Sequence, residues 1–220
     1  MRTGSRPTRS FTLIELMVVI AIIGILVSLT VVGVMSAITS GKVGKTHSLI
    51  TALKAGLEGF SSPSGPGGGT YPPATLNTWG LSHDSTNTGI ETLLMCLRTR
   101  KGGGPFFNIN DWSNMVEDRD DEGTDAGDSY QYFDIDSTKT TLLEIVDPWG
   151  NPLVYVPRDQ YDTDFTILDA NDEFITIRAS YIDTGTGELP AHYVIWSFGP
   201  NGINEYGGGD DIPSWQQGNN

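Results

Sequence analysis

A glycine-rich stretch near the carboxyl terminus contains the oxygen ligands that calcium prefers. It reads NGINEYGGGDD over residues 201–211. Calcium takes six to eight oxygens, and glycines let backbone carbonyls turn inward while carboxylates complete the shell. The alternative is an acidic turn that binds no metal. We predict a calcium site with a neutral amide as its first ligand, and so few charges predict weak binding, with a Kd of about 10⁻⁴–10⁻³ M. Its side-chain ligands would be Asn201, Glu205, Asp210 and Asp211.

A second acidic stretch covers residues 111–136, with ten carboxylates and one base, Arg119. We expect it to be an exposed insertion in a loop. Part of it resembles the opening of an EF-hand loop, but the twelfth position is Ser129 instead of glutamate and no flanking helices are predicted. A solvated acidic loop is therefore the favoured interpretation. The residues that imitate the EF-hand are Asp118, Asp120, Glu122 and Gly123.

Residues that could support catalysis are scattered. The sequence has no nucleophile elbow, zinc-protease motif, paired-cysteine motif or phosphate-binding glycine loop. The three histidines lie far apart, at His47, His83 and His192. The single cysteine, Cys96, falls within a predicted amphipathic helix and is expected to be a buried thiol. We therefore expect a protein that is not an enzyme.

Glu15 stands at the start of a long apolar segment. Residues 16–38 form a run of 23 positions without a formal charge. At a rise of about 1.5 Å per residue, a helix of this length spans the roughly 30 Å core of a bilayer. A carboxylate at the headgroup level is tolerated, whereas an unpaired one inside the membrane costs about 3 kcal/mol. A cleaved secretory signal fits less well, because the run is long and no A-x-A-like site follows it.

The segment RSFTLIELMVVIAIIGIL, residues 9–26, resembles the type III signal sequence of type IV pilins and type II secretion pseudopilins. The resemblance implies that residues 1–10 are a leader, which prepilin peptidase removes between Ser10 and Phe11. Phe11 is then N-methylated, and Glu15 is the glutamate at the fifth mature position. The family usually has glycine where this chain has Ser10. It pairs this glutamate with the amino terminus of a neighbouring subunit, and such a head-to-tail contact builds a helical filament.

The elements around these residues indicate one helix followed by one globular domain. We predict a helix from Phe11 to Phe60, with a transmembrane part over residues 11–39 and an amphipathic part over residues 40–60. The sequence SSPSGPGGG at residues 61–69 ends it. The globular domain, residues 61–220, begins with a short helix at residues 89–100. Strands are predicted at residues 153–156, 165–168, 174–179 and 192–198, the middle two forming a hairpin.

Further segments are similar to the major pseudopilins of type II secretion. They are Tyr71-Pro72, the helix start GIETL at residues 89–93, DPWGNP at residues 147–152, and the tail from Ser197 to Ile212. The resemblance implies an α+β, type IV pilin-like fold, with a long N-terminal helix packed on a small antiparallel sheet and a calcium ion in the C-terminal loop. It adds the backbone carbonyl of Phe198 to the ligands. Residues 108–146 and 158–191 are longer than this family leads us to expect.

The charge distribution limits the kinds of partner that the protein can bind. The net charge is −14, from 27 acidic and 13 basic residues, and three of the bases lie in the first ten positions. Because the remainder is strongly acidic, it would repel a phosphate backbone, which argues against nucleic-acid binding. Arg2, Arg6 and Arg9 give the residues before the apolar segment a denser positive charge than Lys42 and Lys45 give the residues after it. This difference favours an orientation with the amino terminus on the inner side of the membrane.

The resemblance implies a subunit of a pseudopilus that drives the export of folded proteins. We expect a single-pass protein of the inner membrane with its globular domain in the periplasm. Its partners would be further copies of itself, prepilin peptidase, the inner-membrane platform of the secretion system, and minor pseudopilins. The alternatives are a type IV pilin of a surface fibre and a minor tip subunit whose acidic insertion binds a partner.

Overall fold

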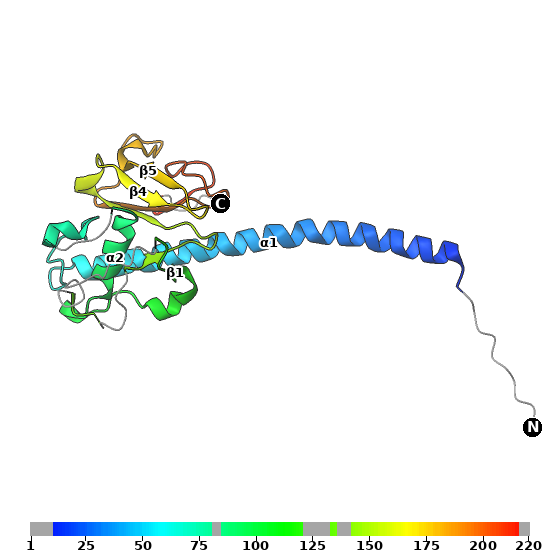
Figure 1. Cartoon of the computed structure of the whole chain (residues 1–220), viewed down its shortest axis with the longest axis horizontal. Helices are drawn as coiled ribbons and strands as arrows, with labels where there is room; N and C mark the ends of the chain where they lie inside the picture. The colour runs from blue at the N-terminus through cyan, green and yellow to red at the C-terminus, as the bar shows by residue number, and fades with distance from the viewer. Residues whose placement is uncertain (1–10, 81–84, 121–132, 136–141, 216–220) are drawn as a thin grey trace, which may run out of the picture. The chain divides into compact units, whose positions relative to one another are not determined.

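A computed structural model describes residues 11–80, 85–120, 133–135 and 142–215 (Figure 1). The chain forms two compact units, Met1–Gly41 and Lys42–Asn220. One continuous helix, α1 (Leu13–Ser61), contributes to both. These bounds agree with the predicted helix to within two residues. The helix ends where the amides of Gly67 and Gly69 donate to the carbonyls of Phe60 and Ser61, which caps its last turn.

The first part of α1 is hydrophobic on every side. Its described large apolar side chains are exposed, as illustrated by Ile20 (59%) and Met35 (66%). None of its most apolar stretch is buried within the chain. By length and composition, this is a helix that can cross a membrane.

The second part of α1 has one buried face. Leu49, Leu53 and Leu57 are fully buried and recur every four residues, which places them on the same side of the helix. Two glycines on α1 allow another segment to come close. A Cβ at Gly56 would lie 2.9 Å from the Phe106 carbonyl oxygen, and one at Gly59 would lie 2.7 Å from the Phe106 ring.

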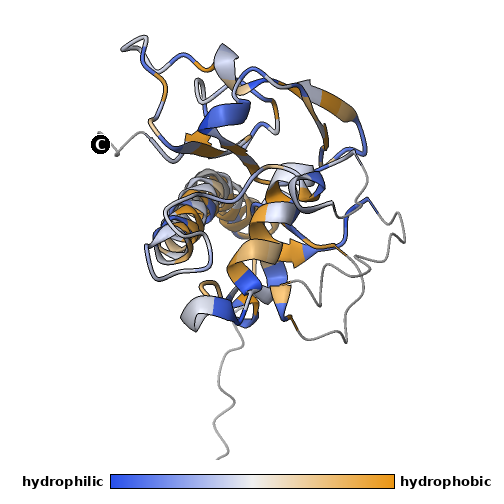
Figure 2. Cartoon of the chain, turned by 90° about the vertical axis from the view of Figure 1, so that its left-hand side faces the viewer, coloured by the Kyte–Doolittle hydropathy of each residue, from blue (hydrophilic) through white to orange (hydrophobic). Residues whose placement is uncertain are grey.

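The remaining elements of this unit surround the buried face, as Figure 2 shows with α1 nearly end-on. Helix α2 (Thr88–Arg98) is buried over all but its last residue and packs in the same core cluster as α1. Cys96 lies in this helix, is fully buried as predicted, and burial raises the pKa of its thiol. Short 3₁₀ helices complete the unit: η1 (Leu76–Trp79), η2 (Lys101–Gly103), η3 (Ile109–Met115), η4 (Arg158–Gln160) and η5 (Ala179–Tyr181).

The strands form three small antiparallel sheets within the described residues, and the expectation of a single sheet is wrong. The central one has the order β3-β6-β7, and the hairpin β4-β5 stands apart from it. Pro157 ends β3 and has no N–H to donate, and η4 then turns the chain away from the sheet. The strands are β1 (Val116–Glu117), β2 (Glu144–Ile145), β3 (Val154–Pro157), β4 (Phe165–Leu168), β5 (Phe174–Ile177), β6 (Tyr193–Ser197) and β7 (Ile212–Pro213).

The central sheet separates two hydrophobic clusters. Tyr155 and Ile195 face the cluster that contains α1 and α2. Val154, Val194 and Trp196 face the second cluster, which they share with the β4-β5 hairpin. Because successive side chains of a strand point to opposite faces, β3 and β6 are apolar on both faces.

The acidic stretch at residues 111–136 is only partly a loop. It begins within η3, continues as β1 and pairs with β2 through Val116 and Ile145. Met115 (1% exposed) and Phe133 (4% exposed) belong to the first hydrophobic cluster. The expectation of a wholly exposed insertion is therefore wrong for these residues, because apolar side chains that lie between the acidic residues pack into the core. Residues 121–132 lie outside the described part.

Candidate functional site

The start of α1 holds Glu15 in a capping box. The amide and the hydroxyl of Thr12 both donate to Glu15 Oε2 at 2.9 Å, and the Glu15 amide donates to Thr12 Oγ1 at 3.2 Å. This reciprocal pair satisfies backbone donors that a helix start otherwise leaves without partners. Thr12 was not among the predicted site residues, although the pattern T-x-x-E before an apolar run is typical of such a cap. Ser10 lies outside the described residues, and Phe11 is 80% exposed.

Three carboxylates converge in the C-terminal loop. Glu205, Asp210 and Asp211 each place an oxygen within 4.8 Å of the other two. Asn201 joins them, because its amide donates to Asp210 Oδ2 (3.1 Å) and its side chain donates to Glu205 Oε2 (3.3 Å). The four side chains predicted as calcium ligands are thus brought together. Phe198, the fifth, contributes its ring to the second hydrophobic cluster, and the role of its carbonyl stays a prediction.

Glycines make this convergence possible. Gly199 and Gly209 both have positive φ angles, of 65° and 51°. A Cβ at Gly199 would lie 2.0 Å from the Asp210 carbonyl oxygen, and one at Gly209 would lie 1.8 Å from Glu205 Oε2. A side chain at Gly199 would collide with the backbone of Asp210, and one at Gly209 would collide with the Glu205 carboxylate. This is the physical reason for glycine at both positions.

The carboxylate of Asp211 is only half satisfied. Its Oδ2 accepts hydrogen bonds from the amides of Glu205 (3.0 Å) and Gly207 (2.8 Å). Its Oδ1 is shielded from solvent and has no hydrogen-bond partner in the described part of the chain, and the side chain is only 8% exposed. Burial and the charges of Glu205 and Asp210 raise the pKa of Asp211 to about 7, despite the two backbone donors.

This donor set fits a hard cation such as calcium. The side chains offer carboxylate and amide oxygens only, with no sulfur or imidazole among them. A buried carboxylate oxygen without a partner is costly, and three neighbouring carboxylates repel one another. A divalent cation would remove both penalties. Asp210 Oδ1 is a second shielded oxygen with no hydrogen-bond partner within the described residues.

Two residues that the sequence analysis missed fasten this loop to the fold. Asn204 Oδ1 accepts from Trp196 Nε1 at 3.1 Å, which ties the loop to β6. Trp215 packs so closely over Gly207 that a Cβ there would lie 2.2 Å from its ring. The Trp196 and Trp215 rings meet edge to face, with centroids 6.3 Å apart. No local sequence pattern predicts these contacts, because each one depends on the tertiary structure.

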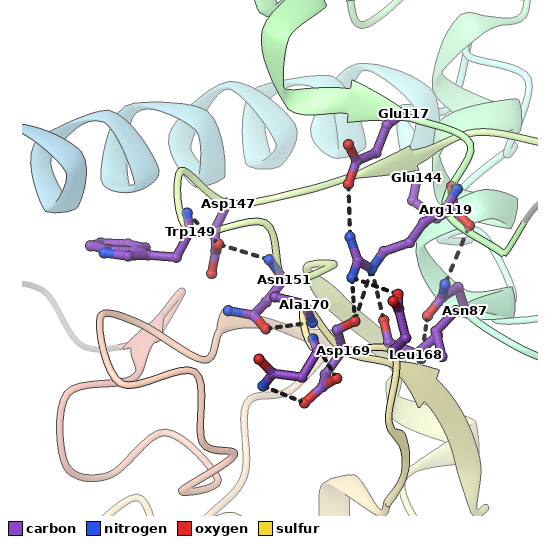
Figure 3. A network of polar contacts seen from close by, with 12 residues as sticks. Asn87, Glu117, Arg119, Glu144, Asp147, Trp149, Asn151, Leu168, Asp169 and Ala170 are labelled. Atoms are coloured by element: carbon purple, nitrogen blue, oxygen red, sulfur yellow. Dashed lines mark hydrogen bonds and ion pairs between the residues drawn. The ribbon is translucent and has the colours of Figure 1, made fainter.

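A second group of carboxylates lies in the interior, where Glu91, Asp120 and Glu144 come within 4.8 Å of one another. Figure 3 shows Glu144, which accepts from the side chain of Asn87 (3.3 Å) and from the amide of Arg119 (2.9 Å). Burial raises the pKa of Glu144. Asp120 therefore groups with residues distant in sequence, which departs from the EF-hand-like arrangement. Two of the residues that imitated an EF-hand, Glu122 and Gly123, lie outside the described part.

Arg119, the one base of the acidic stretch, braces a distant turn (Figure 3). Its Nε donates to the carbonyls of Leu168 (3.3 Å) and Asp169 (3.0 Å), where β4 ends and the turn of the β4-β5 hairpin begins. Its Nη1 contacts Glu117 at 3.2 Å and its Nη2 contacts Asp172 at 3.4 Å. The guanidinium thus links the end of β1 to the hairpin.

Comparison with known proteins identifies the amino-terminal segment. The profile of a family described as the prokaryotic N-terminal methylation motif matches residues 5–31. The chain carries a type IV pilin-like methylation motif. No curated protein and no solved structure matches the chain. The match is confined to the amino-terminal part of the chain and includes the first part of α1.

The motif defines the coarse class of the protein. It implies processing by prepilin peptidase and pilus-like assembly, and it indicates a structural, non-enzymatic subunit anchored in the cell envelope. The long α1 and the small antiparallel sheets are consistent with a pilin-like α+β fold.

Proposed function

We propose that this chain is a pseudopilin, a subunit that polymerises into a pseudopilus and drives the export of folded proteins by type II secretion. The main support is the first part of α1, which is apolar on every side and overlaps the methylation motif of residues 5–31. A helix that is hydrophobic all round requires an apolar environment on every side. Lipid supplies it before assembly, and neighbouring copies of the same helix supply it in a filament.

The start of α1 provides the polar contact between subunits. Cleavage between Ser10 and Phe11 leaves the Thr12 amide and hydroxyl in place, so the capping box that orients Glu15 survives processing. The new Phe11 amine retains its positive charge when methylated. Since both charges are costly alone in lipid, pairing Glu15 with the amine of the next subunit stabilises the assembled state. A contact of this head-to-tail type repeats without closing, which produces a filament.

Mass spectrometry of the native amino terminus tests this proposal. We expect a mature chain that begins with N-methylated Phe11. A chain that retains Met1 would contradict it, because the leader would then block the charged amine on which the contact depends.

We further propose that calcium binds the C-terminal loop through Asn201, Glu205, Asp210 and Asp211, with the Phe198 carbonyl. The support is the half-satisfied, buried carboxylate of Asp211 beside two further carboxylates. Calcium would supply the positive charge that lets all three remain ionised. Ile212 follows Asp211 directly and pairs with β6, so a stable loop also holds the last strand in the sheet.

A further inference from the structure

A pocket of about 410 Å³ opens beside the carboxyl-terminal end of α1. Its volume lies within the range of small-ligand sites in proteins, about 300–1,000 Å³. Three aromatic residues line it, Phe60, Tyr71 and Trp79, together with two prolines. Asp159 is the one charged residue among its described lining. None of the residues proposed for assembly or for calcium binding belongs to this pocket.

The walls of the pocket are held by hydrogen bonds from separate elements. The Tyr155 hydroxyl donates to the Pro72 carbonyl at 2.6 Å. The amide of Ala74 donates to Gln160 Oε1 at 2.8 Å, which fixes the 71–74 segment against η4, where Asp159 lies. In the loop after α1, which also lines the pocket, a Cβ at Gly67 would lie 2.8 Å from the Phe60 ring. The loop therefore lies directly on this ring, and the pocket is formed before any ligand arrives.

Two of the lining rings are also fixed in orientation. Tyr71 lies against the His192 ring, with centroids 5.2 Å apart, and its hydroxyl donates to Glu58 Oε1 at 3.1 Å. Trp79 meets Phe133 edge to face, with centroids 5.1 Å apart. Because these contacts hold the rings in place, binding would cost little side-chain entropy.

We propose that this pocket binds a basic side chain, arginine above all, presented by an extended peptide segment of a partner protein. Faces of tryptophan and tyrosine attract cations, and guanidinium groups are the commonest partners. Asp159 adds a carboxylate, and no lysine or arginine is among the described residues that line the site. The volume exceeds that of one side chain and leaves room for the flanking peptide.

Charge complementarity identifies the occupant as a basic partner. Residues 42–220 contain 26 acidic and 10 basic residues, so this unit attracts cationic segments over a long range. A second copy of this unit has the same excess of acid, so it is a poor charge match for the pocket. The proposal is independent of the secretion role and of calcium.

The test uses the full chain in non-ionic detergent, labelled with ¹⁵N at its tryptophan indoles. The probe is the peptide acetyl-Gly-Arg-Gly-amide, and its neutral control replaces arginine with citrulline. We expect the Trp79 indole signal to shift saturably with the arginine peptide and at least about three-fold more weakly with citrulline. Equal affinity for both peptides would overturn the proposal. So would saturation by a neutral sugar such as maltose in place of the peptide, since the pocket would then be a carbohydrate site.

Matched variants locate the effect. Asp159→Asn should weaken binding about five-fold and Trp79→Leu, followed through the remaining indoles or by calorimetry, about ten-fold. Asp162→Asn removes an equally negative, exposed charge that does not line the pocket, and should leave the affinity unchanged. An equal loss in Asp162→Asn and Asp159→Asn would show general attraction to an acidic surface and overturn the assignment. Unchanged binding in both Asp159→Asn and Trp79→Leu would overturn it as well.

Discussion

The two parts of α1 are built from similar apolar residues but bury them in different ways. In the first part, the apolar side chains surround the helix and remain exposed, as at Ile20. In the second part, Leu49, Leu53 and Leu57 occupy one face and are fully buried by the rest of their own chain. The spacing of the apolar residues thus distinguishes the two parts of α1. The first part needs an apolar partner outside its own chain, whereas the second part is covered by its own domain.

The largest effect on stability should come from a substitution on the buried face of α1. Leu53→Ala should lower the free energy of unfolding of the 42–220 unit by about 2–5 kcal/mol, because it leaves a cavity in the first hydrophobic cluster. All five tryptophans lie beyond residue 42, so their fluorescence during denaturant unfolding of the full chain in detergent reports on this unit. The matched change Ile20→Ala should alter it by less than about 0.5 kcal/mol. A comparable loss in both variants would contradict the contrast.

Substitutions in the first part of α1 should change filament assembly and not the free energy of unfolding. Glu15→Leu removes a costly carboxylate and should insert into membranes at least as well as the wild type. Its incorporation into filaments alongside wild-type chains should fall at least about ten-fold, because the neighbouring amine loses its partner. Quantifying tagged variant in sheared filaments measures this, with Ile14→Leu as the control. Normal incorporation of Glu15→Leu would rule out the pairing role.

Calcium should stabilise the unit from Lys42 onward and leave the first part of α1 unaffected. At ten times its Kd, the ion adds about 1.4 kcal/mol to the free energy of unfolding. This corresponds to a rise in the melting temperature of roughly 3–6 °C relative to chelator. Asp211→Ala should abolish the rise, whereas Asp118→Ala should retain it.

Two other results would contradict a calcium site in the C-terminal loop. If magnesium raised the melting temperature equally, the effect would be screening of an acidic protein, and the loop would not be a calcium site. Loss of the rise in Asp120→Ala, with Asp211→Ala unaffected, would place the ion at the interior group of Glu91, Asp120 and Glu144.

The smallest effect concerns the pH dependence of stability. Burial raises the pKa of Glu144 above its value in the unfolded chain. The folded state therefore binds this proton more tightly, and its contribution is present at low pH and is lost as the pH rises through the folded pKa. Glu144→Gln should thus show a smaller loss of stability from pH 4 to pH 8 than the wild type, as measured by denaturant unfolding. The exposed Glu173→Gln should leave the pH profile unchanged, and an identical profile for Glu144→Gln would contradict the argument.

Much of the framework follows from the sequence because it depends on neighbours along the chain. The bounds of α1, the α2 helix and the hairpin β4-β5 were predicted from periodicity and turn residues, and the structure confirms them within a few positions. The same reasoning placed Cys96 in the interior. The cap formed by Thr12 and Glu15 was also predictable, since the two residues are three positions apart, but it was overlooked.

The remaining features were decided by contacts between residues far apart in sequence. β1 and β2 are two residues each, too short for periodicity to reveal, and they exist because the chain brings Val116 to Ile145. Arg119 reaches the Asp169 turn, 50 positions away, and the interior carboxylates come from three separate segments.

The C-terminal loop shows both contributions in one site. Its composition alone predicted the four side chains that the structure brings together, because glycines and acids are concentrated within eleven residues. Only the tertiary structure could show that Asp211 is buried and that one of its oxygens has no hydrogen-bond partner among the described residues. Its surroundings include Trp215 and β6, which lie close only because of the fold. Local sequence therefore determined which groups meet, and long-range packing determined how deeply Asp211 is buried among them.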